Sequence, residues 1–337
     1  MGDEVQVGLW NDSKSFPNLC SMKLSAFCKA TGDDTELYNP EHSYDLIFAS
    51  KIFTESKEPD FGKTPVIRGG SGYDLHNKLP HHIEHIYPDY SLYPDFKAAL
   101  GVLTRGCPRL NHAQSRGGFC ITPDKDGCRT RKVADLSEFW DGQKEIVLLD
   151  QNLLAASERK ELLQQLIDSN AYVEFNGGMD IRYMTDEVIE MCKKIKVKEW
   201  HLAWDDPEEN LEKHFKRVAE SGLLNTDRCG VYVLTNFWST TEQDLHRIYT
   251  LRKYGFVPYV MLYDKQRFVT NNGKWKKGVE DIFTPEQLTH FKTCQHLQRW
   301  CNTRAIFKST PDFNDYEPYA KWAKAGRPVP KKGGVRL

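Results

Sequence analysis

Short apolar runs alternate with a helical pattern in the first part of the chain. Residues 17–32 (PNLCSMKLSAFCKATG) have the spacing of an amphipathic helix that ends at Gly32. Four runs read as strands, at residues 5–10 (VQVGLW), 35–39 (TELYN), 44–53 (YDLIFASKIF) and 64–70 (TPVIRGG). This alternation predicts a small Rossmann-like parallel sheet, with any ligand at the carboxyl ends of its strands.

The same alternation of apolar runs and helical patterns continues from residue 99 onward. Six apolar runs end in polar or glycine residues, at 99–104, 145–150, 171–178, 199–206, 230–236 and 257–264. Helical patterns follow at 135–140, 157–169, 185–195, 207–221, 241–254 and 285–300. Six strand–helix units are too few for a closed eight-stranded barrel, so the pattern predicts a partial (βα)6 TIM-type barrel. The expected fold class is therefore α/β.

These patterns also predict a domain organisation. We expect a Rossmann-like domain at 1–85, a connector rich in aromatic residues and proline at 86–98, and the partial barrel at 99–305. Residues 306–337 form a C-terminal extension that ends in a basic tail. A chain of 337 residues fits two domains of ordinary size.

Composition indicates a globular, water-soluble protein. Hydrophobic residues make up 39% of the chain and charged residues 28%. No apolar run is long enough to span a membrane and no secretory signal is visible, so we expect a cytoplasmic protein without a membrane partner. A net charge of -1 gives little attraction for nucleic acid, although 321–337 holds six basic residues and no acid. A solvated tail is the main interpretation, and a nucleic-acid contact is the weaker one.

Nine cysteines, without a secretory signal, favour free thiols over disulfides. Four of them are predicted to be small buried hydrophobes, namely Cys192, Cys229, Cys294 and Cys301. Only Cys107, Cys120 and Cys128 gather in a polar loop rich in glycine.

The carboxyl ends of the barrel strands are where the chemistry is expected. Glycines at 177 and 178 let the backbone approach a ligand, and Arg182 has the planar fork that pairs with a carboxylate. The other strand-end candidates are Cys107, Asp150, Asp205, Asn236 and Asp264. Asp and Asn after a strand are also common helix caps and turn formers, so that alternative stays open for each of them.

Several segments together resemble a group of radical S-adenosylmethionine proteins. These segments are LTRGCPR, KVADLSEFWDGQKEI, LLDQNLLA, FNGGMDIR, HLAWDDPEENL, GVYVLTNF, PYVMLYDK and CNTRAIFKS. The resemblance covers most of the chain and implies a [4Fe-4S] cluster, held by a C-x3-C-x2-C loop, and S-adenosyl-L-methionine on its open iron. It also implies an N-terminal domain similar to the cobalamin-binding domains of related enzymes.

The resemblance implies roles for individual residues. Phe119 matches the hydrophobic residue near the adenine, while Gly177, Gly178 and Arg182 correspond to the region that serves S-adenosylmethionine. Asp150, Asn152 and Asn236 become ribose or substrate contacts. The implied activity is formation of a 5′-deoxyadenosyl radical that modifies an unknown substrate, such as a nucleoside, RNA or peptide. An electron donor such as flavodoxin or ferredoxin would be the partner.

The cysteine loop departs from the family pattern. The middle cysteine is absent, and the interval between Cys107 and Cys120 is six residues longer than the pattern allows. Two thiolates do not hold such a cluster firmly, so a third ligand is needed. Cys128 is the first choice and His112 the second. The open alternatives are a Cys3His zinc site of these four residues, an inert remnant of a cluster loop, and a sequence error or recombination.

The predicted Rossmann-like domain lacks the expected cobalamin ligand. The family motif D-x-H-x-x-G belongs in the loop after the first strand, where this chain has NDSKSFPN. Asp74 and His76 match the first letters of the motif, but far downstream and without the glycine. We therefore expect a domain without cobalamin. The competing hypothesis for the whole chain is a catalytically silent relative that uses the barrel for binding or scaffolding.

Overall fold

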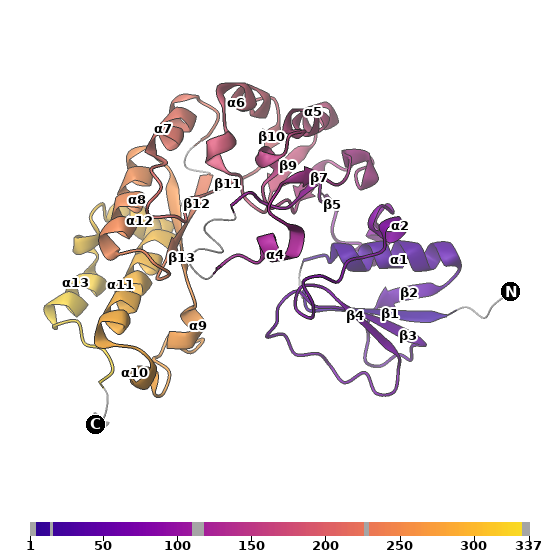
Figure 1. The fold of residues 1–337 in the computed structure, drawn as a ribbon, viewed down its shortest axis with the longest axis horizontal. Coiled ribbons are helices and arrows are strands. Elements are labelled where there is room, and N and C mark those ends of the chain that lie inside the picture. The colour runs from indigo at the N-terminus through magenta and orange to yellow at the C-terminus, as the bar shows by residue number, and fades with distance from the viewer. Residues whose placement is uncertain (1–4, 14–15, 110–117, 226–228, 332–337) are drawn as a thin grey trace. The chain divides into compact units, whose positions relative to one another are not determined.

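The computed structural model describes residues 5–13, 16–109, 118–225 and 229–331 (Figure 1). The chain divides into two compact units. The first comprises Met1–Gly177 with Lys193–Lys198, and the second comprises Gly178–Cys192 with Glu199–Leu337. Each unit is an α/β structure built on parallel strands, which agrees with the predicted class.

The first unit begins with a four-stranded parallel sheet in the order β2-β1-β3-β4. Its strands are β1 Gln6–Asn11, β2 Asp34–Leu37, β3 Leu46–Ser50 and β4 Val66–Gly69. Helix α1 (Leu19–Thr31) connects β1 to β2 and buries Met22 against Leu9 and other residues of the sheet. Asn18 caps its first turn, and Gly32 ends it in the left-handed region at φ 96°.

The strand order of this sheet creates a crevice. From β1 the chain passes through α1 to β2 on one side, and then returns across β1 to β3 on the other. The loops that leave β1 and β3 therefore run in opposite directions, which is where open parallel sheets bind ligands. No helix follows β2 or β3 before the next strand, so the Rossmann-like pattern is reduced to one crossover helix.

A second parallel sheet belongs to the same unit, in the order β10-β9-β8-β5. Its strands are β5 Ala99–Gly101, β8 Glu145–Leu148, β9 Tyr172–Phe175 and β10 Lys196–Val197. Leu100 and Val147 join the apolar core that also contains Leu9 and Met22. Both sheets share this core and belong to the same compact unit.

Shorter elements complete the first unit. A two-stranded antiparallel ribbon of β6 (Thr104–Arg105) and β7 (Arg131–Lys132) frames the cysteine loop, which we define as residues 105–130. The helices are α2 His81–Glu84, α4 Thr122–Asp126 and α5 Arg159–Ser169, with 3-10 turns at Tyr90–Leu92, Leu136–Glu138 and Leu153–Ala155. The helix predicted at 135–140 is thus only a 3-10 turn.

The second unit carries three parallel strands, β11 Trp200–Ala203, β12 Cys229–Thr235 and β13 Val257–Leu262. Its longer helices are α7 Glu212–Glu220, α8 Thr241–Lys253 and α11 Pro285–Asn302. The shorter ones are α6 Asp186–Cys192, α9 Lys265–Phe268, α10 Val279–Ile282, α12 Arg304–Ser309 and α13 Glu317–Lys324, with 3-10 turns at Ile181–Tyr183 and Phe313–Asp315. All six predicted strands are present, but they lie in two separate sheets, and no sheet of the described chain is closed.

Helix α7 starts five residues later than the pattern predicts. Residues 207–209 form a turn instead of the first helical turn. The Asp206 carboxylate accepts the backbone N–H of Glu208 at 2.8 Å, and the Glu209 carbonyl accepts the Trp204 indole N–H at 3.0 Å. These local hydrogen bonds compete with helix formation, because a short polar side chain can satisfy the backbone in a turn.

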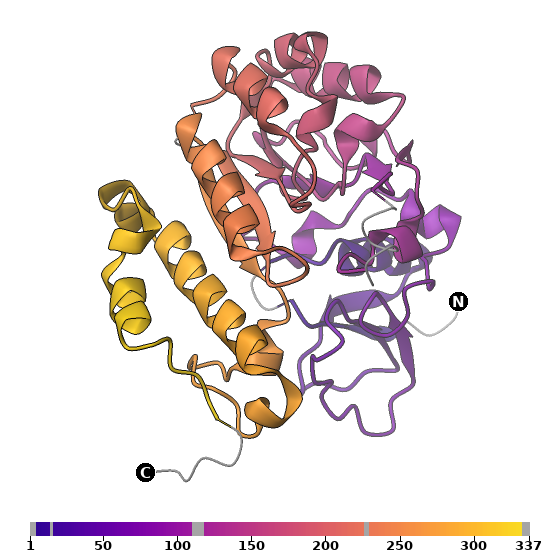
Figure 2. The same ribbon diagram turned by 60° about the vertical axis from the view of Figure 1, so that its left-hand side comes forward.

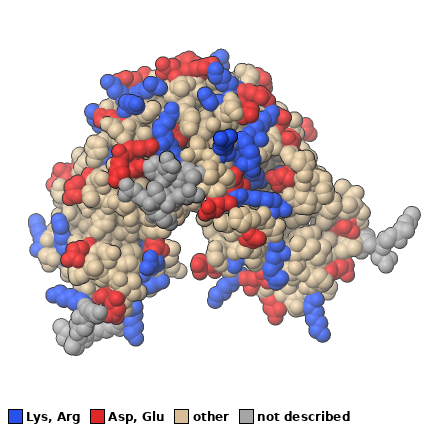
Figure 3. All heavy atoms as spheres, viewed as in Figure 1, with Lys and Arg blue, Asp and Glu red and all other residues tan. Residues whose placement is uncertain are grey.

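The predicted C-terminal extension is an integral part of the second unit. Figure 2 shows α12 and α13 beside α11, and Trp300 of α11 packs at 5.3 Å from the Phe313 ring. Trp322 of α13 belongs to the same buried cluster. Within the described chain, no helix combines the length and apolar character needed to cross a membrane. On the face drawn in Figure 3, positive and negative side chains are intermixed, as the near-zero net charge suggests.

Candidate functional site

The cysteine loop returns to its own starting point. The backbone N–H of Cys107 donates to the carbonyl oxygen of Gly127 at 3.2 Å, and Gly127 directly precedes Cys128. Helix α4 lies between Cys120 and Gly127 and so brings the chain back. Cys107 and Cys120 are partly buried, and Cys128 is exposed. The first and last cysteines of the predicted set are therefore held at one end of a closed loop.

Asp150, at the end of β8, anchors the chain just before this loop. Its carboxylate accepts the backbone N–H of Leu103 at 3.1 Å, and the backbone N–H and hydroxyl of Thr104 at 2.5 Å each. Only 4% of the residue is exposed, and this burial raises the pKa of Asp150 to about 6, although its hydrogen bonds act in the opposite direction. The carboxylate predicted to contact ribose or substrate thus engages the loop itself.

The side chain of Gln151 makes a second set of polar contacts with the cysteine loop. The Gln151 side chain accepts the backbone N–H of Gly106 at 3.1 Å and donates to the Asp126 carboxylate at 2.7 Å. Gly106 has φ 91°, and a Cβ there would lie 2.2 Å from the carbonyl oxygen of Arg129. Only glycine fits this position. Sequence reasoning missed all three residues, although the run DQN after β8 was a signal for Gln151.

One polar side chain reaches the first cysteine directly. Asn152 is 3% exposed, and its amide nitrogen lies 3.5 Å from the Cys107 sulfur. An N–H group directed at sulfur is a contact that iron–sulfur sites use to adjust the properties of a thiolate ligand. The contact is compatible with a metal ligand at Cys107.

The residues predicted near S-adenosylmethionine have partners within the chain. A Cβ on Gly177 would lie 1.9 Å from the carbonyl oxygen of Asp150, so this glycine permits the close approach of two strand ends. The Arg182 guanidinium pairs with the carboxylates of Asp180 and of Glu209, the latter at 2.6 Å. Gly178 has φ 82° and lies next to the backbone of His201.

The strand ends of β12 and β13 repeat one feature. Asn236 (φ 62°) and Asp264 (φ 51°) both adopt the left-handed conformation directly after their strands. Asn236 donates to the Tyr263 carbonyl at 3.1 Å, and Asp264 pairs with Arg267 at 3.0 Å. Both side chains have the geometry of turn formers, which is the alternative that the sequence left open.

Phe119 and His112 are two further candidates of the cysteine loop. Phe119 is partly buried at the start of the second half of the cysteine loop. His112 falls in 110–117, outside the described residues.

Among the described residues, one group of three ligand atoms lies close enough to hold a single metal ion, namely Asp244, His290 and Cys294. Their atoms are within 4.8 Å of one another. Burial raises the pKa of the Cys294 thiol well above its ordinary value. Cys107, Cys120 and Cys128 do not form such a group within the described chain. Cluster ligands bind separate irons, so they need not approach one another as closely as the ligands of one ion.

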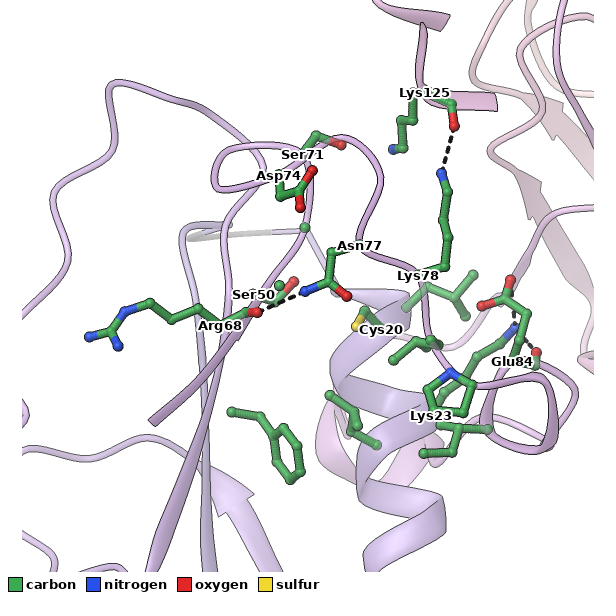
Figure 4. A pocket seen from close by; sticks show the side chains of 18 of the residues that line it. Cys20, Lys23, Ser50, Arg68, Ser71, Asp74, Asn77, Lys78, Glu84 and Lys125 are labelled. Carbon is green, nitrogen blue, oxygen red and sulfur yellow. Dashed lines mark hydrogen bonds and ion pairs between the residues drawn. The ribbon is translucent and has the colours of Figure 1, made fainter. Parts of the chain in front are cut away.

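A cavity of about 510 Å³ opens in the first unit, at the carboxyl ends of β3 and β4 and the start of α1 (Figure 4). It therefore occupies the side of the sheet where the strand order predicts a ligand. Its apolar lining includes Leu19, Leu24, Phe48, Ile67, Leu79, Ile83, Val102 and Leu149. Arg105, two residues before Cys107, lines the same cavity.

The cavity has an uneven charge. Lys23 and Arg105 both pair with Glu84, at 3.6 and 2.7 Å, and Lys78 pairs with Asp126 at 3.1 Å. Lys125 projects from α4 and is part of the lining of the cavity (Figure 4). Burial lowers the pKa of Lys125. A partly desolvated cation facing an apolar cavity would be stabilised by an anionic ligand.

Asp74 and His76, which match the first letters of the cobalamin motif, lie in a turn after β4. The Asp74 carboxylate accepts the backbone N–H of His76 at 2.8 Å, which makes this segment a turn. Asp74 lines the cavity, whereas His76 is exposed and is not part of the lining.

No model of a known protein family matches the chain, and no curated protein matches it either. The resemblance to radical S-adenosylmethionine proteins therefore rests on the segments quoted above.

Proposed function

We propose that the chain is a radical S-adenosylmethionine enzyme whose six strand–helix units form a partial (βα)6 barrel. The proposed ligands of a [4Fe-4S] cluster are Cys107, Cys120 and Cys128, with His112 as the second choice for the third position. One observation carries the proposal. The N–H of Cys107 bonds to the carbonyl of Gly127 at 3.2 Å, which brings the backbone next to Cys128 back to the first cysteine.

The donor set fits such a cluster in its chemistry. Thiolates are the usual ligands of iron–sulfur clusters, and hydrogen bonds to sulfur adjust their potential. The Asn152 amide supplies such a contact to Cys107 at 3.5 Å. When bound, the cluster and S-adenosylmethionine would supply a 5′-deoxyadenosyl radical for hydrogen abstraction. An electron donor such as flavodoxin or ferredoxin would be the partner.

The residues of the chain orient the loop and receive the substrate. Asp150 and Gln151 fix the backbone on either side of Arg105 through hydrogen bonds of 2.5 to 3.1 Å. The cavity lined by Arg105 and Lys125 is the proposed binding place for an organic substrate with an anionic group. Its apolar walls exclude water from the rest of that molecule.

The experiment is anaerobic reconstitution of the full chain with iron and sulfide. The wild type should acquire the absorption and the electron paramagnetic resonance signal of a [4Fe-4S] cluster. Cys128→Ala should abolish this signal, and Cys20→Ala, which changes a cysteine outside the loop, should leave it unchanged. A wild type that stays colourless after every attempt at loading would reject the cluster. A loaded Cys128→Ala variant would reject only Cys128 as a ligand and direct attention to His112.

A catalytically silent binding protein is the second candidate. The observation that favours it is Arg182, because Asp180 and Glu209 already neutralise the guanidinium expected to bind S-adenosylmethionine. The enzyme and the silent binding protein differ in whether 5′-deoxyadenosine is formed. Under reducing conditions, the loaded enzyme should release 5′-deoxyadenosine from S-adenosylmethionine. A fully loaded protein that releases none would support the silent module.

A further inference from the structure

We propose that the second unit binds one zinc ion between α8 and α11. The ligands are Asp244 of α8, and His290 and Cys294 of α11, which we call the α8–α11 trio. The sequence pattern predicted only a buried hydrophobe at Cys294. This site is separate from the cysteine loop and does not depend on the function proposed for it.

The distances within the trio match a tetrahedral zinc site. The Cys294 sulfur lies 3.5 Å from Nε2 of His290 and 3.7 Å from Oδ2 of Asp244. Zinc binds sulfur at about 2.3 Å and nitrogen or oxygen at about 2.0–2.2 Å, so tetrahedral angles place the sulfur about 3.6 Å from either ligand atom. Both distances to the sulfur thus already match the spacing that one ion requires, and the His290 and Asp244 ligand atoms lie within 4.8 Å of each other. A water molecule would complete the four-coordinate site.

Both helices hold their ligands on rigid backbone. His290 and Cys294 are four residues apart on an 18-residue helix, so they share one face. Asp244 lies in the first turn of α8. Thr240 and Thr284 each begin their helix with a capping box, which fixes the helix ends nearest to the trio.

The environment orients two of the ligands as a metal site requires. The Thr241 hydroxyl lies 3.4 Å from Nδ1 of His290, so the Nδ1–H tautomer leaves Nε2 free to face Cys294. Metal-binding histidines usually donate their second N–H to such a partner. Asp244 and Cys294 are both fully buried, so an ion at this position would be shielded from solvent.

The neighbouring Arg247 is compatible with a cation here. Its guanidinium donates to Oδ1 of Asp244 at 2.5 Å, whereas Oδ2 of Asp244 lies 3.7 Å from the Cys294 sulfur. The same guanidinium also donates to the backbone carbonyls of Trp204, Asp205 and Leu234 at 2.7 to 2.9 Å. These carbonyl dipoles and the carboxylate disperse its charge, and the Cys294 thiol releases a proton when the metal binds.

The test uses a full chain that carries Cys107→Ser, Cys120→Ser and Cys128→Ser, so that the loop thiols cannot bind the metal. We expect this protein to bind one Zn²⁺ per chain. Bound Co²⁺ should give a thiolate charge-transfer band together with the visible bands of a tetrahedral site. Adding Cys294→Ser should abolish the charge-transfer band. Adding His290→Ala should weaken Zn²⁺ binding about 100-fold or more, because ligand loss exceeds the effect of losing a supporting residue.

Two variants on the same helix are the controls. Cys301→Ser changes another buried cysteine of α11, and His296→Ala changes a histidine that packs among aromatic rings. Both should bind Zn²⁺ as tightly as the parent. Zinc should also raise the melting temperature of the parent and of both controls, but not of the His290→Ala variant. A parent that binds no Zn²⁺, or a His290→Ala variant that binds it equally well, would show that the trio is a hydrogen-bonded cluster only.

Discussion

Two cysteine-containing ligand sets occur in this protein, and they are built in opposite ways. In the first unit, Cys107, Cys120 and Cys128 lie on a loop, partly or fully open to solvent, and side chains such as Asp150 hold the backbone around them. In the second, Asp244 and Cys294 are fully buried on two capped helices.

A fold can thus position a metal ligand in two ways. A loop ligand depends on a network of polar contacts, each of which can be removed separately. A helix ligand depends on packing and on the regular spacing of one face. We therefore expect substitutions around the trio to affect the stability of the second unit, and those around the loop to affect loading with iron.

Arg247→Met should cause the largest loss of stability. It removes a fully buried cation and leaves the Asp244 carboxylate without its partner at 2.5 Å. Breaking a buried ion pair costs about 3–5 kcal/mol, and we expect a loss of about 4 kcal/mol in the free energy of unfolding. Equilibrium unfolding in guanidinium chloride measures this loss.

Arg182→Met is the matched control, since that side chain is 25% exposed and also has carboxylate partners. It should lose about 1 kcal/mol or less. Equal losses in the two variants would remove the distinction between the buried cluster and the more exposed pair.

Gly106→Ala should disrupt the cysteine loop. A Cβ at this position would lie 2.2 Å from the Arg129 carbonyl, and the backbone has φ 91°. Strain and overpacking together predict a loss of about 3 kcal/mol in unfolding free energy. Iron loading should fall as well.

Gly142→Ala serves as the control, because Gly142 has φ 82° but nothing within 4 Å of the added Cβ. It should lose only about 1 kcal/mol and keep full iron loading. If Gly106→Ala loads iron as well as the wild type, the loop geometry is not what supports the ligands.

Asp150 should make the first unit less stable as the pH rises. Burial raises its pKa from 3.8 to about 6 in the folded protein, so between these values the folded state binds more protons than the unfolded state. The free energy of unfolding should therefore fall by about 2 kcal/mol between pH 4 and pH 6 from this group alone.

Asp150→Asn removes the titrating group and should remove this part of the pH dependence. Urea unfolding at several pH values between 4 and 7 gives the free energy of unfolding against pH for the wild type and for the variant, and the slopes of the two curves are compared. Parallel curves for the two proteins would contradict the assignment of a raised pKa to Asp150.

Thr284→Ala should have the smallest effect. The Thr284 hydroxyl accepts the backbone N–H of Gln287 at the start of α11. Loss of such a cap costs about 1 kcal/mol of unfolding free energy. Thr289→Ala, about one turn further along α11, changes a partly buried threonine whose hydroxyl donates only to the Pro285 carbonyl of the same helix at 2.8 Å. Such a bond adds little to helix stability, so this variant should change the free energy of unfolding by less than about 0.5 kcal/mol. Thermal unfolding can rank the two, and the opposite order would be inconsistent with the capping role.

Local patterns predicted the regular elements well. Helix α1 was recognisable from its amphipathic spacing and from Gly32 at its end. The six later strands were recognisable because each is a short apolar run that ends in polar or glycine residues. Helix α7 was misplaced, since the Asp206 side chain favours a turn over a helical start. Sequence patterns show which structure a segment prefers locally. They do not show whether a side-chain hydrogen bond, such as that of Asp206, will replace the first turn of a helix.

The candidate sites show the same limit at longer range. The cysteine loop was visible because its thiols are close in the sequence. The α8–α11 trio was not, because Asp244 and His290 meet only after two helices pack. Lys125 and its cavity were missed for a similar reason, since their surroundings come from separate strands and loops.

The most direct test counts iron and zinc in the same anaerobically loaded sample. We predict about four iron atoms and one zinc ion per chain in the wild type. Cys128→Ala should lose the iron and keep the zinc, and Cys294→Ser should lose the zinc and keep the iron. If neither substitution changes its metal, or if both metals are absent from the loaded wild type, the account of two separate metal sites is wrong.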